Sequence, residues 1–295
     1  HSYSSAASDV YKRQVLIFRA TDVLSFAQPA MVVVGAGFIS YFATQLGIPF
    51  IFAFIIGIIL TGLLGFILER TFLRPMVGEP VFSVAVLTIG IDILLRVILD
   101  NWIGINPKYM GDPFPSYGNF GSLNIGGLTV KYLEVTALIT SLILISILSV
   151  FFKRSKYGVA MRATSLDQEA ALAQGINVGR VFGLVWFIAG LLAAFAGFFI
   201  TGGFNTLTNT SFISALRALP AVVIGGLDSI TGAIIGSLII GLTQAYVGYY
   251  QFDIESAYNI KLGNGFSIVA PYLIMFVILL VKPHGLFGTE EVERV

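Results

Sequence analysis

The chain has 295 residues, of which 56% are hydrophobic and 11% are charged. Soluble domains carry about 25% charged residues, so this composition excludes an ordinary soluble protein and predicts an integral membrane protein. The 17 basic and 16 acidic residues give no indication of nucleic-acid binding, and the absence of Cys excludes disulfides and thiolate metal sites. With His1 and His284 as its only histidines, the chain also lacks the residues for a histidine-based metal or catalytic cluster.

Residues 1–14 are polar and directly precede the apolar Val15, without the pattern of a signal peptide. They resemble translated adapter sequence, so we interpret them as a non-native leader and exclude them from the predicted fold. On this interpretation we expect Val15–Phe18 to be the end of a truncated first membrane span. A native polar leader is the alternative.

A membrane-spanning helix needs about 20 mostly apolar residues, and lipid offers no partner for open sheet edges. Apolar runs of this kind occupy residues 23–46, 49–69, 81–101, 131–152, 181–202, 230–250 and 266–282. The shorter apolar segment 212–226 is a further candidate for crossing. We therefore predict an all-α fold, a polytopic membrane helix bundle of about 7–8 transmembrane helices. It forms a single membrane domain over residues 15–288.

Basic residues accumulate in short cytoplasmic loops, which gives the orientation. The connector 69–80 and the loop 153–180 carry several basic residues and are placed inside. The long connector 102–130 carries a single Lys and is placed outside. The tail 289–295 is then cytoplasmic if the segment 212–226 crosses.

Polar side chains within the predicted spans are the candidates for a transport pathway. Asp92 and Arg96 lie four residues apart on one helix face and can form an ion pair, which lowers the cost of charge in lipid. They are either a substrate or gating contact or a self-contained structural pair, and we favour the second because a paired Arg needs no ligand. Gln28 either lines the pathway or makes a hydrogen bond between helices.

A second group of pathway candidates lies in the segment 212–226. It carries Arg217 and ends in Gly225-Gly226, which allow a sharp break between two half-crossing helices. Broken helices often border transport sites.

The loop 153–180 is the longest charged segment between two apolar runs. Within it, Ser165 followed three residues later by Gln168 predicts a capping box at the start of a helix. Asp167 and Glu169 fall in the first turn of that helix, where the helix dipole favours negative charge.

Gly175 ends the same predicted helix, because glycine adopts a left-handed conformation without steric cost. We therefore expect a short helix over about 166–174. The small side chains of Ala170 and Ala171 in its middle would let it seat closely in the groove of a partner.

Several stretches resemble permeases of branched-chain amino acid ABC importers. Leu24-Ser25-Phe26-Ala27-Gln28 is similar to an Asn-Phe-Ala-Gln-Gly stretch near the start of that family, with Ser25 and Pro29 as departures. The connector Glu69-Arg70, three residues, Arg74-Pro75 resembles the family's Glu-Arg-x3-Arg-Pro connector. Glu169-Ala170-Ala171, three residues, Gly175 resembles the EAA-x3-G loop of importer permeases.

Two further stretches follow in the family's order. Residues 225–232, Gly-Gly-Leu-Asp-Ser-Ile-Thr-Gly, resemble a Gly-Gly-Leu-Gly-Ser-Ile-Pro-Gly signature, with Asp228 and Thr231 as substitutions. Residues 282–288, Lys-Pro-His-Gly-Leu-Phe-Gly, resemble the family's basic-Pro-x-Gly-Leu-Phe-Gly tail.

This resemblance, over about residues 15–288, implies a multi-pass permease subunit of an ATP-driven importer in the cell (inner) membrane. The expected solute is a branched-chain amino acid or a related small polar molecule. The implied partners are a second permease subunit, homologous or identical, two ATP-binding subunits, an extracytoplasmic substrate-binding protein and the lipid bilayer, with no nucleic acid. In this family the EAA loop forms a coupling helix that docks into the ATP-binding subunit. The resemblance thus marks Glu169, Ala170, Ala171 and Gly175 as coupling residues. The predicted start of the same helix adds Ser165 and Asp167.

The chain has no Gly-x4-Gly-Lys-Ser/Thr loop that could cradle a nucleotide phosphate. We therefore expect it to bind no cofactor and not to be an enzyme, with ATP hydrolysis in a separate subunit. The alternative is a secondary transporter or passive channel for a small solute, which would use Asp92 and Arg96 as an ion or proton relay.

Overall fold

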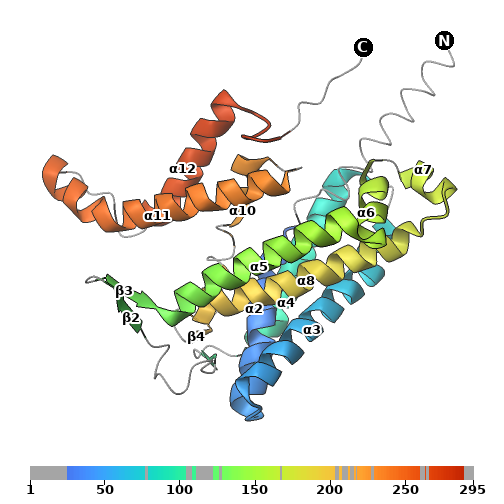
Figure 1. Cartoon of the computed structure of the whole chain (residues 1–295), viewed down its shortest axis with the longest axis horizontal. Coiled ribbons are helices and arrows are strands. Elements are labelled where there is room, and N and C mark those ends of the chain that lie inside the picture. Colours follow the sequence, from blue (N-terminus) through green and yellow to red (C-terminus); the bar gives the residue numbers. More distant parts are fainter. Residues whose placement is uncertain are drawn as a thin grey trace. The chain divides into compact units, whose positions relative to one another are not determined.

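The computed structural model divides the chain into two compact units, residues 1–215 and residues 216–295, which are described separately (Figure 1). The structure describes residues 25–76, 79–103, 108–110, 122–125, 128–166, 168–202, 206–207, 212, 216, 218–226, 229–259, 263 and 266–288. The predicted leader and the predicted truncated first span lie outside the described residues.

Five of the described helices are long and apolar enough to cross a membrane, which confirms the all-α membrane bundle. They are α3 (Phe50–Leu68), α4 (Val81–Ile103), α5 (Tyr132–Arg154), α8 (Val178–Gly202) and α11 (Ile230–Tyr258). A shorter apolar helix, α12, spans Phe266–Val281. The predicted spans match these helices closely, except that α11 extends to Tyr258 instead of ending near residue 250.

In the described part of the chain, four short strands that were not predicted accompany the helices. Strand β1 (Lys108–Tyr109) pairs antiparallel with β4 (Thr206–Leu207). Strands β2 (Ser122–Ile125) and β3 (Leu128–Lys131) form an antiparallel hairpin in which Ile125 is opposite Leu128. All four lie in or beside connectors between the long helices, and Leu207 of β4 is buried in the core of the first unit.

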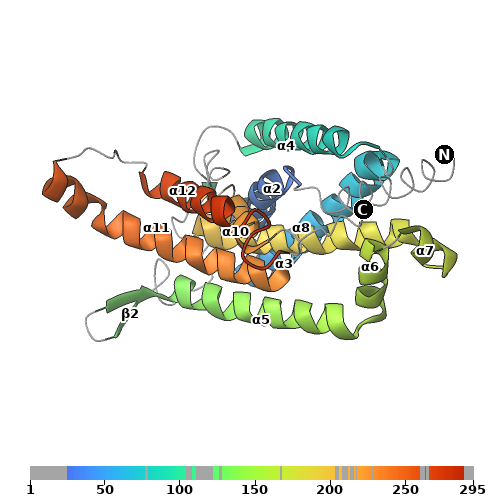
Figure 2. The same ribbon diagram turned by 90° about the horizontal axis from the view of Figure 1, so that it is seen from above.

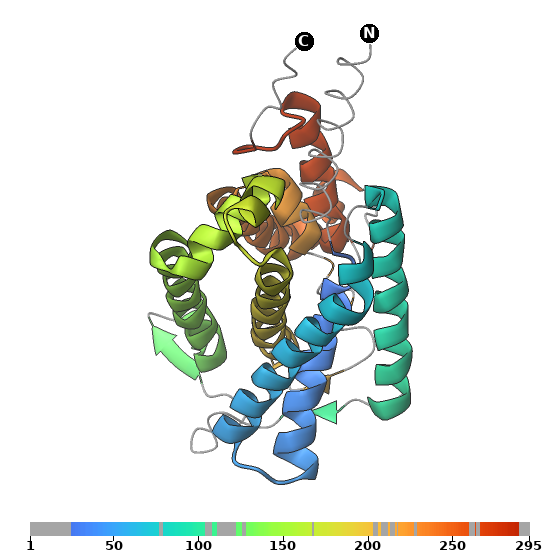
Figure 3. The same ribbon diagram turned by 90° about the vertical axis from the view of Figure 1, so that its right-hand side faces the viewer.

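Helix α2 (Gln28–Ser40) is shorter than the predicted span 23–46 and continues as a π-helical turn, η1 (Tyr41–Gln45). Pro29 in the first turn accounts for the start, because its fixed φ and missing N–H suit that position. Figure 3 shows α2 (blue) between α4 (teal) and α8 (yellow).

Small residues bring α2, α3 and α8 close together in the core of the first unit. A Cβ built on Gly197 of α8 would lie 2.1 Å from the carbonyl oxygen of Val32 in α2. A Cβ on Gly190 would lie 2.4 Å from the carbonyl oxygen of Thr61 in α3. Backbones that approach this closely favour small side chains at the crossing, as is common between membrane helices.

The loop 153–180 folds as two helices, α6 (Lys156–Leu166) and α7 (Gln168–Ala173), which follow α5 and precede α8 (Figure 2). The prediction had placed only one helix there, over about 166–174. Ser155 starts α6, since its Oγ accepts a hydrogen bond from the N–H of Gly158 at 2.9 Å. Gly158 also packs on the end of α5, where an added Cβ would lie 2.5 Å from the carbonyl oxygen of Phe151.

In the second unit, α10 (Ala218–Gly225) packs against α11 and α12. A Cβ on Gly225 would lie 2.2 Å from the backbone of Gly232, so these two helices touch through glycines. The chain after α12 returns to the end of α10, where the N–H of Leu286 donates to the carbonyl oxygen of Ile224 at 2.8 Å. Phe212 and Leu216 of the predicted segment 212–226 are helical as well, and its crossing of the membrane stays a prediction.

Candidate functional site

The C-terminal end of α7 forms the turn expected from Gly175. This residue has a φ of +80°, and its N–H donates to the carbonyl oxygen of Leu172 at 2.9 Å. The N–H of Ile176 donates to the carbonyl oxygen of Ala171 at 3.0 Å. This pair of hydrogen bonds is the Schellman motif, which satisfies carbonyl groups at a helix end and requires a left-handed residue.

The predicted capping box at the start of α7 is wrong. Ser165 lies in the last turn of α6, where its hydroxyl donates to the carbonyl oxygen of Arg162 at 2.9 Å. Because α7 begins only at Gln168, Ser165 is two residues too early to be its N-cap. The other residue predicted for the first turn, Asp167, lies outside the described residues.

Helix α7 has one buried and one exposed side. Ala171 is 3% exposed, and α7 contacts α6 and α8. Leu172 is 57% exposed, and Glu169, Ala170 and Ala173 are exposed as well. The predicted coupling residues Glu169 and Ala170 therefore lie on a surface that a second protein can reach, whereas Ala171 packs within the chain.

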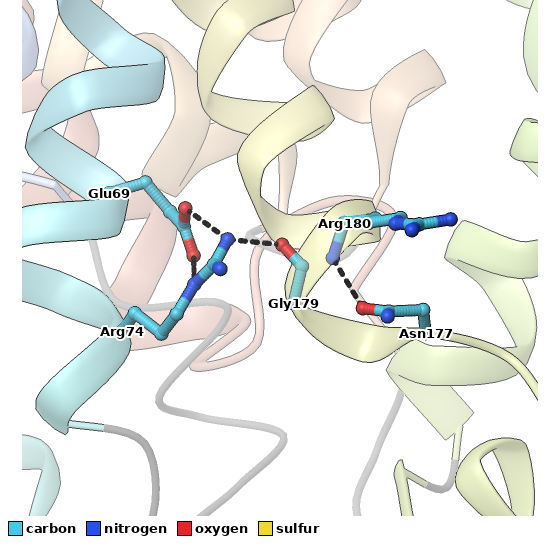
Figure 4. A network of polar contacts seen from close by, with 5 residues as sticks. All are labelled: Glu69, Arg74, Asn177, Gly179 and Arg180. Atoms are coloured by element: carbon cyan, nitrogen blue, oxygen red, sulfur yellow. Dashed lines mark hydrogen bonds and ion pairs between the residues drawn. The ribbon is translucent and has the colours of Figure 1, made fainter.

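The connection from α7 to α8 is short and hydrogen-bonded. Asn177 immediately precedes α8, and its Oδ1 accepts a hydrogen bond from the N–H of Arg180 at 3.0 Å (Figure 4). Such an N-cap fixes the direction of the first turn. Only Ile176 and Asn177 lie between Gly175 and α8.

The buried Glu69 and the partly exposed Arg74 form an ion pair after the end of α3, in the π-helical turn η2 (Glu69–Leu73) and the short 3₁₀ turn η3 (Arg74–Met76). Glu69 is 1% exposed, and its Oε2 lies 2.9 Å from Nη2 of Arg74. The same Nη2 donates to the carbonyl oxygen of Gly179 at 2.7 Å (Figure 4). The Arg74 guanidinium thus holds a carboxylate from one helix and a backbone carbonyl from another.

Glu69 and Arg74 were singled out from the sequence only as part of a resemblance, and this contact was not predicted. A buried carboxylate requires a charged or hydrogen-bonding partner, so an acid at the end of a span with an Arg five residues later was the available signal. Gly179 takes part in this contact only through its backbone carbonyl, so its residue type gives no signal for the contact in the sequence.

The predicted ion pair within the membrane is confirmed. Nη2 of Arg96 donates to Oδ2 of Asp92, both on α4. The ring of Phe212 covers the guanidinium, with its centroid 4.0 Å from Cζ of Arg96. Gln28, the third candidate, is the half-buried first residue of α2.

The remaining pathway candidates, Arg217, Gly225 and Gly226, belong to the second unit. Gly225 ends α10 in close contact with α11, and Gly226 has a φ of +103° at the break before α11. The predicted break between two helices is confirmed, but α11 is long enough to cross a membrane by itself and is not a half-crossing helix. Both glycines have a packing role at the break. A role in the pathway stays a prediction, and Arg217 lies outside the described residues.

Comparison with known proteins identifies the family to which this chain is similar. The family described as branched-chain amino acid transport system / permease component matches residues 15–281. The permease protein BraD of the Pseudomonas aeruginosa high-affinity branched-chain amino acid transport system is 25% identical over 95% of this chain and 91% of its own length. No solved structure gives a significant match.

Two further relatives are similar over most of the chain. The permease protein LivH of the Salmonella typhimurium high-affinity branched-chain amino acid transport system is 30% identical over 82% of this chain and 75% of its own length. The probable branched-chain amino acid transport permease protein LivH of Methanocaldococcus jannaschii is 28% identical, over 93% and 86% respectively. Together with the apolar helices, these matches establish that the chain is a multi-pass membrane protein and belongs to the family of branched-chain amino acid transport system permease components.

Proposed function

We propose that this chain is the permease subunit of an ATP-driven importer that carries branched-chain amino acids, or a related small polar solute, across the cell (inner) membrane. The observation that carries the proposal is α7: a short helix with an exposed side, fixed to α8 by the turn at Gly175. The chain itself binds no cofactor in this proposal. Two separate ATP-binding subunits hydrolyse ATP, and an extracytoplasmic binding protein delivers the solute to a pair of permease chains.

The mechanism is a movement of packed helices as rigid bodies. Closure of the ATP-binding subunits displaces α7, and the short connection at Ile176 and Asn177 passes the displacement to α8. Helix α8 packs tightly on α2 and α3, and Arg74 ties its start to Glu69. These three helices therefore move together, because close-packed backbones cannot slide independently.

The experiment is transport in proteoliposomes that contain the permease chains and the ATP-binding subunits, with the binding protein added outside. Uptake of radiolabelled leucine is measured with ATP, with ADP, and without the binding protein. The proposal predicts uptake only with ATP and the binding protein present. Equal uptake with ADP would contradict it and would support the secondary transporter or channel, for which the relatives give no support.

A further inference from the structure

We propose that Asp92 and Arg96 of α4, together with Ser25 at the start of α2, form a contact site for a zwitterionic α-amino acid within the membrane. The inference rests on the proposed function, since it assumes that an amino acid passes through this chain. It reverses the interpretation favoured by the sequence, which was that a paired Arg needs no ligand.

The ion pair between Asp92 and Arg96 leaves buried hydrogen-bonding atoms without a partner. Asp92 is 4% exposed and uses Oδ2 for Arg96, but its Oδ1 has no hydrogen-bond partner within the described residues. Nε of Arg96 and Oγ of Ser25 are likewise buried without a partner there. Folded proteins pair nearly all such atoms, so one acceptor, one N–H donor and one hydroxyl left unpaired indicate a site that a ligand completes.

The carboxylate of Asp92 lies at mid-depth in the membrane span. Asp92 is the twelfth of the 23 residues of α4, counting from Val81, and so lies midway along a membrane span. Helix α2 runs in the same direction beside α4, since the rings of Tyr41 and Trp102 near their C-terminal ends are 5.2 Å apart. Asp92 is ten residues before Trp102, and Gln28 is 13 before Tyr41. Helix α2 therefore starts inside the span, near the level of Asp92.

A helix that starts within the membrane directs its unpaired N–H groups into the protein interior. No side chain caps α2 at Ala27, so the N–H groups of its first turn have no side-chain acceptor there. In transporters, helix ends at this depth typically face the solute. The buried, unpartnered Oδ1 of Asp92 is the independent sign that this helix start faces a ligand.

The unpaired atoms of Asp92 and Arg96 match the two charged groups of an amino acid. Oδ1 of Asp92 can accept a hydrogen bond from an ammonium group, and Nε–H of Arg96 can donate one to a carboxylate. An α-amino acid carries both groups on one carbon and matches an adjacent acid and base. A simple anion or cation would instead meet a like charge beside the opposite one, and an uncharged sugar would leave both charges unmatched. Phe212 covers one face of the guanidinium, and the edge that carries Nε–H is the part of Arg96 available for such a contact.

The test uses the detergent-purified complex of permease and ATP-binding subunits without binding protein, so that only the permease can select the ligand. Thermal unfolding is followed with leucine, with leucinamide, which lacks the carboxylate, and with isovalerate, which lacks the ammonium group. We expect leucine to raise Tm and the two analogues to leave it unchanged. A wild-type complex that leucine does not stabilise, or that both analogues stabilise equally, overturns the proposal.

Two variants identify the residues. Arg96→Lys keeps the charge that pairs with Asp92 but lacks Nε–H, and Asp92→Asn removes the charge that holds an ammonium group. Each should abolish the Tm increase and raise KM for leucine uptake about tenfold, the effect of one lost charge-assisted hydrogen bond. Asp100→Asn, on the same helix and exposed, is the matched control and should behave as wild type.

The outcomes separate this inference from the proposed function. If the wild-type complex takes up leucine with ATP, and folded Arg96→Lys retains the wild-type KM and Tm increase, the contact site is wrong while the importer stands. If Asp92→Asn fails to fold, Arg96→Lys still decides the question, because its ion pair is preserved. Loss of ATP-dependent uptake in the wild-type complex would instead contradict the proposed function itself.

Discussion

Arg74 donates a hydrogen bond to the backbone carbonyl of Gly179, 105 residues further along the chain, at 2.7 Å. The same guanidinium pairs with the carboxylate of Glu69, which is buried at the end of α3. The side chain of Arg74 therefore connects α3 and α8 at the start of α8, just after α7. This contact ties the first turn of α8, which directly follows the connection from α7, to the end of α3.

Replacing Glu69 by Gln should weaken this connection, because Arg74 loses its charged partner while the shape of the side chain is kept. We expect a loss of about 1–3 kcal/mol in the free energy of unfolding, the usual effect of leaving a buried polar group poorly paired. We also expect less leucine uptake per ATP hydrolysed. Thermal unfolding and the ratio of uptake to hydrolysis measure the two effects.

The matched control is Glu79→Gln, because Glu79 is an exposed acid in the same connector. It should stay within about 0.5 kcal/mol of wild type, as surface substitutions usually do. Equal stability of the two variants would show that the Glu69–Arg74 pair contributes nothing to the fold.

Replacing Gly175 by Val should uncouple ATP hydrolysis from transport. A β-branched residue is strained at a φ of +80°, by about 1–2 kcal/mol, so the turn between α7 and α8 must rearrange. Apart from Gly175 and its two chain neighbours, no described atom lies within 4 Å of the Cβ that the new side chain would add, so backbone strain, not crowding, is the cause. Hydrolysis and uptake by reconstituted complexes provide the measurement.

Gly175→Asn serves as the comparison, since Asn tolerates the left-handed conformation better than Val. It should retain more coupled uptake than Gly175→Val at equal amounts of protein. If both variants transport as well as wild type, the turn does not transmit the movement.

Replacing Gly197 by Ala should destabilise the first unit by about 1–3 kcal/mol. The new Cβ would lie 2.1 Å from the carbonyl oxygen of Val32, so α8 and α2 must separate. Gly90→Ala is the control, because Gly90 lies within α4 and a Cβ added there would meet no described atom within 4 Å. It should be neutral or stabilising by up to about 1 kcal/mol, and thermal unfolding of both variants in detergent distinguishes the two results.

The long helices were predictable because membrane spans depend on local hydropathy alone. α3 was predicted at 49–69 and is found at Phe50–Leu68, and the stop at Gly175 followed from glycine's conformational freedom. The capping box failed because Ser165-x-x-Gln168 is equally compatible with the end of one helix and the start of the next. The sequence therefore did not distinguish one helix from the pair α6 and α7.

Structural features that depend on contacts between distant segments of the chain were not predictable from the sequence. The spacing of Asp92 and Arg96 predicted their pairing, but their unused atoms depend on the neighbouring α2 and on Phe212. Likewise, the strands β1 and β4 are too short to leave a periodic pattern. Gly225 was assigned to a pathway from its position in a motif, whereas its contact with Gly232 shows a packing role.

The most direct test of the coupling mechanism uses the absence of Cys from the chain. A single Leu172→Cys substitution on the exposed side of α7 carries a thiol-reactive photocrosslinker in the assembled complex, and Leu142→Cys on the membrane helix α5 is the control. The account predicts a crosslink from position 172 to the ATP-binding subunit and none from position 142. An active complex that forms no crosslink at position 172, or the same crosslink from both positions, would contradict it.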